Sequence, residues 1–299
     1  MLYYRRKILL ALLYLFDGQL TAKSLQKYLF LFTRKQSVKS FDFVPYRYGC
    51  FSFQANQDLI TLQTYGYLEI AEQSGGRFIK LKEADNYLLM LDMFDRQAMT
   101  EIKETFGNLS QNDLIRYTYL NYPYYATKSS IANQLLTPVE ISEIENQKRK
   151  SDVPELFTIG YEGISLETYT NKLIINDVHV LCDVRKNAFS QKYGFSKSQL
   201  QKACDGVGIK YIHIPELGIE SEKRQELKSQ KDYDVLFDNY EKTTLKNNHK
   251  VLLRIREMID VEKRVALTCF EKNPMQCHRT RVANALMHLP DISYTFKAI

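Results

Sequence analysis

The pattern of hydrophobic and polar residues changes character about halfway along the chain. In the first half, apolar residues recur at helical spacing over residues 5–16, 21–33 and about 53–64. Thr21 at the start of the second segment and Ser52 just before the third are suitable N-caps. The next stretch, YLEIAEQSGGRFIKL, has two apolar runs around a Ser-Gly-Gly turn and predicts a β-hairpin.

Three helices followed by a hairpin are the order of a winged helix, in which the third helix is the usual recognition element. We expect Gln54 and Gln57 of this helix to contact base edges. On the hairpin, the candidates for phosphate contacts are Arg77, Lys80 and Lys82. The third helix contains no Lys or Arg, so docking to a protein, or dimerisation, stays open as the alternative to DNA binding.

The same region is similar to a known kind of protein. The phrases LQKYLFLF, FVPYRYGCFS and DLITLQTYGYLEI resemble winged-helix-like proteins of the Panacea and SocA kind, over about residues 5–130. Those proteins carry a YGPFS phrase before a helix, and Cys50 stands here at the position of its proline. The resemblance implies a winged-helix-like domain of the type found in phage-associated and antitoxin proteins.

The end of this first half sets the domain boundary. Helical periodicity continues over residues 86–120, with Ser110 as a further N-cap, and residues 137–151 are rich in charge and predict a linker. We therefore expect two domains, residues 1–150 and residues 151–299. A chain of 299 residues agrees with this, since a domain usually takes roughly 100–200 residues.

Short apolar strands and amphipathic helices alternate from residue 155 on. Strands are expected within LFTIGYEG, VHVLCDVR, IKYIHIP and RVALTCF, with helical segments between them and after the last. Such alternation predicts an α/β domain with a mainly parallel, Rossmann-like sheet and flanking helices. The predicted fold is therefore this domain preceded by a helical, winged-helix-like one.

Charged and reactive side chains follow the predicted strands, where open α/β sheets bind their ligands. The candidates are Tyr161, Asp183, Arg185, His213, Glu216, Cys269 and Glu271, joined by Cys277, His278 and Arg279 at the start of the last helix. Each has a structural explanation when taken singly: Asp183 and Arg185 could form an ion pair, and His213 could be a core histidine. Their convergence on one sheet edge predicts a functional site.

The stretch CFEKNPMQCHR predicts how the last helix begins. Asn273 can be its N-cap and Pro274 its first residue, which puts Gln276 at the capping-box position and Cys277 in the first turn. A helix N-terminus favours anions and thiolates. The expected roles are anion binding for Tyr161, Arg185, His278 and Arg279, acid–base chemistry for Asp183, His213, Glu216 or Glu271, and nucleophilic attack for Cys269 or Cys277.

A metal site is the weaker alternative. Its ligands would be Cys269, Cys277, His278 and His213, but eight positions between two cysteines followed by an adjacent histidine is not a typical zinc pattern. Adjacent Cys and His side chains on a helix also point about 100° apart. The sequence therefore predicts no metal ligand and no cofactor.

The second half resembles the domain-of-unknown-function 488 family over about residues 155–290. The matching phrases, in order, are the TIG strand, DVR, Y-x-H-x-P-E-L-G and C-x-E-x-x-P-x-x-C-H-R. The resemblance implies a compact α/β domain and no particular reaction. A weaker likeness to rhodaneses, in the DVR strand end and a cysteine between a strand and a helix, hints at thiol chemistry.

Composition narrows the function only modestly. The net charge of +6 permits a nucleic-acid or nucleotide partner without demanding one. Five cysteines without regular spacing are typical of reduced thiols in the cytoplasm. The sequence contains no apolar run of about 18 residues, so we expect no membrane span. We expect a protein that binds or processes an anionic ligand. The alternatives are a non-enzymatic DNA-binding regulator or defence-type sensor, which could form a homodimer, and a rhodanese-like enzyme.

Overall fold

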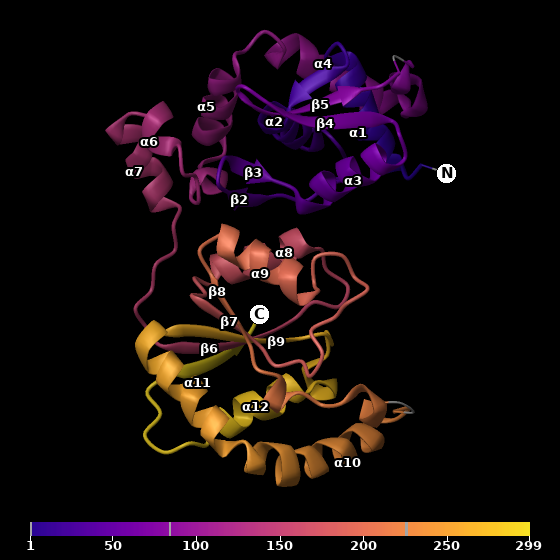
Figure 1. Cartoon of the computed structure of the whole chain (residues 1–299). Coiled ribbons are helices and arrows are strands. Elements are labelled where there is room, and N and C mark those ends of the chain that lie inside the picture. Colours follow the sequence, from indigo (N-terminus) through magenta and orange to yellow (C-terminus); the bar gives the residue numbers. More distant parts are fainter. Residues whose placement is uncertain (1, 84, 225–226) are drawn as a thin grey trace. The chain divides into compact units, whose positions relative to one another are not determined.

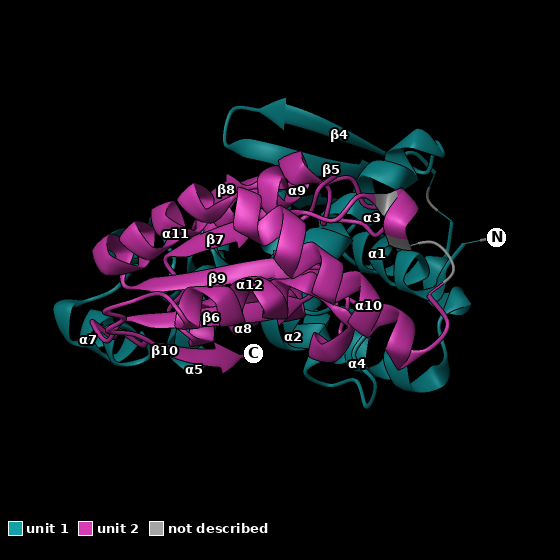
Figure 2. Ribbon diagram, turned by 90° about the horizontal axis from the view of Figure 1, so that it is seen from below, with its two compact units in different colours: residues 1–148 teal, residues 149–299 magenta. Residues whose placement is uncertain are grey.

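The computed structural model describes residues 2–83, 85–224 and 227–299. Contacts within the chain divide it into two compact units, unit 1 (residues 1–148) and unit 2 (residues 149–299), coloured separately in Figure 2. Among the described residues, no helix is both long and apolar enough to cross a membrane.

Unit 1 opens with the three predicted helices and the predicted hairpin. Its first elements are α1 (Tyr4–Leu15), β1 (Gln19–Thr21), α2 (Ala22–Thr33), β2 (Val44–Tyr46), β3 (Gly49–Phe51), α3 (Phe53–Thr64), β4 (Leu68–Gln73) and β5 (Gly76–Leu81). The predicted caps are confirmed, because the side chains of Thr21 and Ser52 accept hydrogen bonds from backbone N–H groups at the starts of α2 and α3. The short strand β1, which periodicity missed, pairs antiparallel with β5 and gives the sheet order β1-β5-β4.

A second group of helices completes unit 1. It comprises a 3₁₀ turn (Tyr87–Met90), α4 (Met93–Phe106), α5 (Gln111–Asn121), a second 3₁₀ turn (Pro123–Ala126), α6 (Ala132–Leu135) and α7 (Pro138–Asn146). The prediction of a linker over residues 137–151 is wrong for α7. Thr137 and Glu140 form a capping box, and Arg116 binds the same Glu140 carboxylate, so the charges serve helix formation and packing.

Unit 2 confirms the predicted α/β fold. Its elements are β6 (Glu155–Gly160), α8 (Leu166–Ile175), β7 (Val180–Asp183), α9 (Lys197–Gly206), β8 (Lys210–His213), α10 (Gln230–Tyr240), a π-helical segment (Glu241–Leu245), α11 (His249–Glu262), β9 (Arg264–Cys269), α12 (His278–Met287) and β10 (Thr295–Ala298), with 3₁₀ turns at Pro215–Leu217, Ser221–Arg224 and Pro274–Gln276. The five strands are all parallel, in the order β10-β6-β9-β7-β8. The edge strand β10 was not predicted, because it has only four residues; all four are exposed, and their alternation is too short to indicate a strand.

The sheet of unit 2 lies between two layers of helices. Helices α8 and α9 cover one face, and α10, α11 and α12 lie on the other (Figure 1). Leu156, Val265 and Leu267 pack with Ile255 and Leu286 of α11 and α12 in one apolar cluster. Strand β9 is buried along its whole length and lies between β6 and β7. This order brings the carboxyl ends of β6, β9 and β7 side by side.

Candidate functional site

Strand register sets the geometry of the predicted site. Gly160 of β6 pairs with Cys269 of β9, and Asp183 of β7 pairs with Thr268 of β9 and His213 of β8. The chain segments that leave these strands therefore start at one edge of the sheet. The structure brings the predicted residues together there in two neighbouring polar groups.

The first group is built around a buried ion pair between Asp183 and Arg185, the structural explanation considered from the sequence. Asp183 is 0 % exposed and Arg185 is 5 % exposed. The Arg185 Nε donates to one Asp183 oxygen at 2.8 Å and its Nη2 donates to the other at 2.5 Å. Its Nη1 donates to the Tyr161 hydroxyl at 2.7 Å and to the Phe195 carbonyl at 2.9 Å. We call this set, with Tyr211, the ion-pair group.

Tyrosines close the ion-pair group on two sides. The Tyr211 hydroxyl donates to Asp183 at 2.6 Å, and the Tyr161 ring stacks on Phe195 with centroids 4.2 Å apart. Burial opposes the charge on Arg185, but the Asp183 carboxylate outweighs this effect and raises the Arg185 pKa above its ordinary value. Most of the guanidinium is therefore engaged within the protein.

The candidates after β8 lie beside this group. The His213 ring is half-buried, and its Nε2 donates to the Arg185 carbonyl at 2.9 Å. Glu216 is exposed, and its backbone carbonyl accepts a hydrogen bond from Asn248 at 3.2 Å. Gly218 lets this segment approach the Lys186 backbone, because a Cβ at Gly218 would lie 2.0 Å from the Lys186 nitrogen.

The loop after β9 passes directly over the end of β6. A Cβ on Gly160 would lie 2.1 Å from the Glu271 carbonyl oxygen, so the close approach requires glycine. The Arg279 guanidinium, 2 % exposed, holds this loop by donating to the Glu271 carbonyl at 2.5 Å and to the Lys272 carbonyl at 3.4 Å. Among the described residues, its buried Nε has no hydrogen-bond partner.

The predicted start of the last helix needs correction. Asn273 does cap a turn that begins at Pro274, but this is a separate 3₁₀ turn that ends at Gln276, so Gln276 is not at a capping-box position of the helix. Cys277 then adopts an extended conformation, with φ −131° and ψ 132°, and is the N-cap residue of α12. The cysteine therefore precedes the helix, and His278 is the first helical residue.

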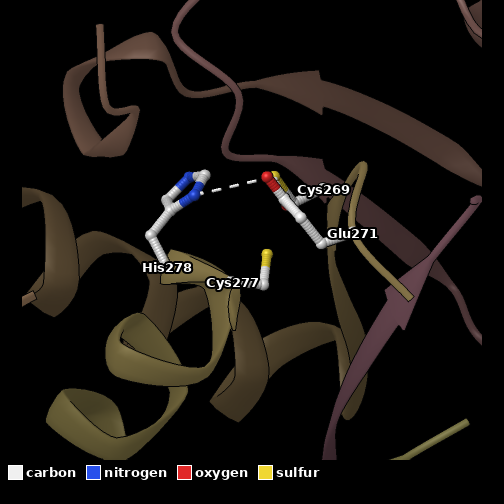
Figure 3. A group of neighbouring side chains, drawn as sticks. All are labelled: Cys269, Glu271, Cys277 and His278. Carbon is white, nitrogen blue, oxygen red and sulfur yellow. Dashed lines mark hydrogen bonds between the residues drawn. The ribbon is translucent and has the colours of Figure 1, made fainter. Parts of the chain in front are cut away.

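The second polar group gathers at this bend. Ligand-type atoms of Cys269, Glu271, Cys277 and His278 all lie within 4.8 Å of one another. The Cys269 thiol donates to the Glu271 carboxylate at 3.1 Å, and its sulfur lies 3.6 Å from His278 Nδ1. Figure 3 shows the four side chains pointing toward one shared space. We call these four residues the thiol group; His213 is not one of them.

Burial governs the chemistry of the thiol group. Cys269, Cys277 and His278 are buried and Glu271 is half-buried. Burial raises the pKa of the Cys277 thiol well above its ordinary value, and the neighbouring Cys269 and Glu271 raise it further, against an opposing effect of Arg279. Burial and these two neighbours oppose the thiolate that the helix N-terminus was expected to favour at Cys277. No disulfide joins the five cysteines, all of which are described.

A cavity of about 240 Å³ opens at the same sheet edge. It is lined by Tyr161, Arg185, Lys186, Asn187, Phe189, Ser190, Ile219, Cys269 and Phe270. These described lining residues include two cations and three aromatic rings but no Asp or Glu. Lys186, Asn187 and Phe189 were not among the predicted site residues; the signal available was the run after DVR, KNAFSQK, which combines cations with polar and aromatic side chains.

A larger cavity of about 320 Å³ lies beyond Gly218. It shares Lys186 and Ile219 with the first but also includes Glu216, Glu220 and Lys223, so its charges are mixed. We assign the candidate site to the smaller cavity, because that one borders both polar groups at the strand ends.

The residues predicted to contact nucleic acid lie in unit 1. Gln54 and Gln57 are half-buried on α3, and the Gln54 amide donates to Asp58 at 3.2 Å. Lys80 and Lys82 are exposed, and Arg77 is half-buried, on or beside β5. Cross-strand neighbours of Arg77 and Lys80 on β4 are acidic (Glu72 and Glu69), which reduces the net positive charge of the hairpin.

Comparison with known proteins places part of the chain in a family. Residues 165–286 match the model of a family described as Domain of unknown function DUF488, within the α/β unit that carries both polar groups and the smaller cavity. No curated protein and no solved structure gives a significant match to the chain. The similarity of unit 2 to the DUF488 family, indicated by its strand-end phrases, is therefore confirmed.

Proposed function

We propose that unit 2 binds an anionic ligand of the nucleotide or nucleic-acid class in the 240 Å³ cavity at the carboxyl ends of β6, β7 and β9. The observation that carries the proposal is the lining: two cations, two polar side chains and aromatic rings, without a carboxylate among the described residues. Ligands of parallel α/β sheets bind at this edge.

Lys186 supplies the main mobile charge. It is exposed, whereas Arg185 directs most of its donors to Asp183, Tyr161 and the Phe195 carbonyl. Arg185 thus forms part of the cavity wall with its charge balanced by Asp183, and the exposed Lys186 can move to meet a phosphate. Asn187 and Ser190 add hydrogen-bonding groups beside it.

Phe189 and Phe270 supply flat apolar surface. These residues are 69 % and 43 % exposed, and both line the cavity, so their rings are accessible to a ligand there. A base can stack on such rings, and stacking contributes about 1–3 kcal/mol per base. Cations beside exposed aromatic rings therefore favour a nucleotide or a nucleic-acid end over inorganic phosphate alone.

The test is binding of full-length protein to two oligothymidylates of equal length, one with a 5′-phosphate and one without. We expect the phosphorylated probe to bind more tightly and Lys186→Glu to weaken it about tenfold or more, which corresponds to about 1.4 kcal/mol. Phe189→Ala is expected to weaken both probes. The matched controls are Lys202→Glu, an exposed lysine on α9, and Phe94→Ala, an exposed phenylalanine of unit 1.

Equal affinity of wild type and Lys186→Glu for both probes, measured by fluorescence anisotropy, would contradict the proposal. So would an equal loss in Lys202→Glu, because it would indicate an effect of net charge without a specific cavity.

A second candidate function belongs to unit 1, as a winged helix that docks on duplex DNA. Its element order and the sheet β1-β5-β4 support this proposal. The single carboxylate of α3, Asp58, is 0 % exposed and is paired with Arg5 and Arg6 of α1. The helix therefore presents amide side chains to a duplex with no exposed acidic group of its own.

Salt dependence tests this candidate. We expect the full-length protein to bind random-sequence duplex DNA with an affinity that falls as salt rises. Replacing Lys80 and Lys82 by alanine is expected to reduce the logarithmic salt slope by about 0.9 for each phosphate that is no longer neutralised. Lys103→Ala on α4 is the control. An unchanged slope in the double variant would favour docking to a protein instead.

A further inference from the structure

We propose that the thiol group (Cys269, Glu271, Cys277 and His278) is a binding site for one divalent transition-metal ion, best suited to Zn²⁺. This site shares Cys269 with the lining of the 240 Å³ cavity, but the inference does not depend on the proposed anion-binding function. Four side chains that all carry metal-ligand atoms converge there from the end of β9, the loop after it and the start of α12.

The spacing of the four atoms suits a tetrahedral ion. With Zn–S near 2.3 Å and Zn–N near 2.0–2.1 Å, tetrahedral geometry puts two sulfurs about 3.8 Å apart and a sulfur and a nitrogen about 3.5 Å apart. The Cys269 sulfur lies 3.6 Å from His278 Nδ1, and all four atoms lie within 4.8 Å. A separation of 4.8 Å would have to shorten by about 1 Å to match tetrahedral coordination.

The histidine is held in the tautomer that a metal requires. His278 Nε2 lies 2.8 Å from the Val184 carbonyl, which can only accept, so Nε2 carries the proton. Nδ1 then carries the lone pair, and this is the nitrogen that faces Cys269. Metal-binding histidines commonly donate their other ring N–H to a backbone carbonyl in this way.

The charges balance when the ion is present. Two thiolates and a carboxylate carry three negative charges, the ion supplies two positive ones, and Arg279 supplies the third from its bonds to the loop of Glu271. The two thiol protons leave to solvent as the sulfurs coordinate. Sulfur ligands select Zn²⁺ over Mg²⁺ or Ca²⁺, which prefer oxygen.

The local backbone explains why the sequence disfavoured a metal. From the sequence, Cys277 and His278 were both expected to be helical and to point about 100° apart. Cys277 is in fact an extended N-cap residue, so its side chain turns toward the same space as His278 (Figure 3). Glu271, and not His213, completes the set.

The test is metal uptake by the full-length protein after chelation and buffer exchange. We expect one Zn²⁺ per chain by mass spectrometry of the metal content. Co²⁺ should give the thiolate-to-metal charge transfer and the intense visible absorption of a tetrahedral sulfur site. Loss of a residue that only hydrogen-bonds to a metal ligand lowers metal affinity about 10–100-fold. Cys277→Ser and His278→Gln each remove a ligand itself, so each should lower the Zn²⁺ affinity by more than this.

Cys204→Ser, a buried cysteine on α9, and His213→Gln are matched controls and should retain the metal. Lys186→Ala should also retain it, which separates this inference from the anion-binding one. If the cysteine variant does not fold, the wild-type Co²⁺ spectrum and His278→Gln still decide the question. The inference is overturned if chelated wild type takes up neither ion at micromolar concentrations, if Co²⁺ shows no thiolate charge transfer, or if the variants bind like wild type.

Discussion

Two polar groups lie at the same sheet edge of unit 2, and they differ in whether their side chains pair with groups of opposite charge. In the ion-pair group, the Asp183 carboxylate meets the Arg185 guanidinium and the Tyr211 hydroxyl, so a negative group is surrounded by donors. In the thiol group, two thiols, a carboxylate and an imidazole converge, and each offers an electron pair. The first group is complete within the protein, whereas the second has the composition of a ligand set.

Clusters of polar residues at strand ends can therefore serve different purposes, one structural and one suited to binding a ligand. Buried ion pairs are costly to break, because removing one partner leaves an uncompensated charge away from water. A buried cluster of electron-pair donors gains most when a cation enters it. The contrast between the two groups can be tested by substitution and by pH.

The largest expected effect is from Asp183→Ala. The substitution leaves Arg185 charged and buried, so we expect a loss of about 3–5 kcal/mol in the free energy of unfolding, measured by urea denaturation. The double variant Asp183→Leu with Arg185→Met removes both charges and should be more stable than Asp183→Ala alone. A loss below about 1 kcal/mol for the single variant would mean that Arg185 is not held in a buried ion pair and can reach solvent.

Tyr211→Phe tests the same group more gently. It removes one hydrogen bond to the Asp183 carboxylate, and bonds to charged groups are worth about 1.5–3 kcal/mol. We expect a loss of that size in urea denaturation and little further loss in the Asp183→Leu, Arg185→Met background. Equal losses in both backgrounds would show that the hydroxyl acts through something other than Asp183.

Lys27 in unit 1 is a buried lysine that donates a hydrogen bond to the Cys50 carbonyl at 3.0 Å, so it differs from Arg185, which is paired with a carboxylate. Burial lowers the Lys27 pKa, so the unfolded chain holds the proton more tightly than the folded one. The unfolding free energy of wild type, compared with Lys27→Met, should therefore rise as pH rises toward the usual lysine value of about 10.4, by about 1.4 kcal/mol for each unit of pKa difference. A difference that is flat between pH 7 and pH 10 would contradict this.

The smallest effect is expected from Cys277→Ala in metal-free protein. Burial keeps the Cys277 thiol protonated and neutral, so its removal without an ion breaks no buried ion pair. A loss of about 1 kcal/mol, typical of point substitutions, is therefore expected in the presence of a chelator. With Zn²⁺ at 100 times its dissociation constant, wild type should gain about 2.7 kcal/mol that the variant does not. A loss in chelator as large as that of Asp183→Ala would erase the distinction between the two groups.

Much of the architecture could be predicted from local patterns. Helices α1, α2 and α3, the β4–β5 hairpin and four of the five parallel strands follow from periodicity and caps such as Thr21 and Ser52. The short hairpin of β2 and β3 was missed, and three further misses have local causes. β1 has only three residues, β10 has no buried face, and α7 was hidden in a charged stretch whose Thr137 and Glu140 form a capping box.

The site was predicted as a set of residues but not as an arrangement. The strand ends indicated Asp183, Arg185, Cys269 and Glu271, since parallel strands end at one edge. Periodicity could not indicate that Cys277 is extended, because a single non-helical residue between a 3₁₀ turn and a helix leaves no pattern. Nor could it identify Phe195 or Val184, whose backbone carbonyls accept from Arg185 and His278.

Local patterns were enough to predict the fold of unit 2 and the edge of the sheet where its chemistry gathers, because alternation and strand direction can be read along the chain. Which residues meet at that edge depends on packing over long range. Gly160 lets the Glu271 backbone cross β6, Arg279 ties down that loop, and the Val184 carbonyl sets the His278 tautomer. Several of these contacts join residues far apart in the chain, and their partners are mostly backbone atoms, which every residue carries and no sequence pattern can mark.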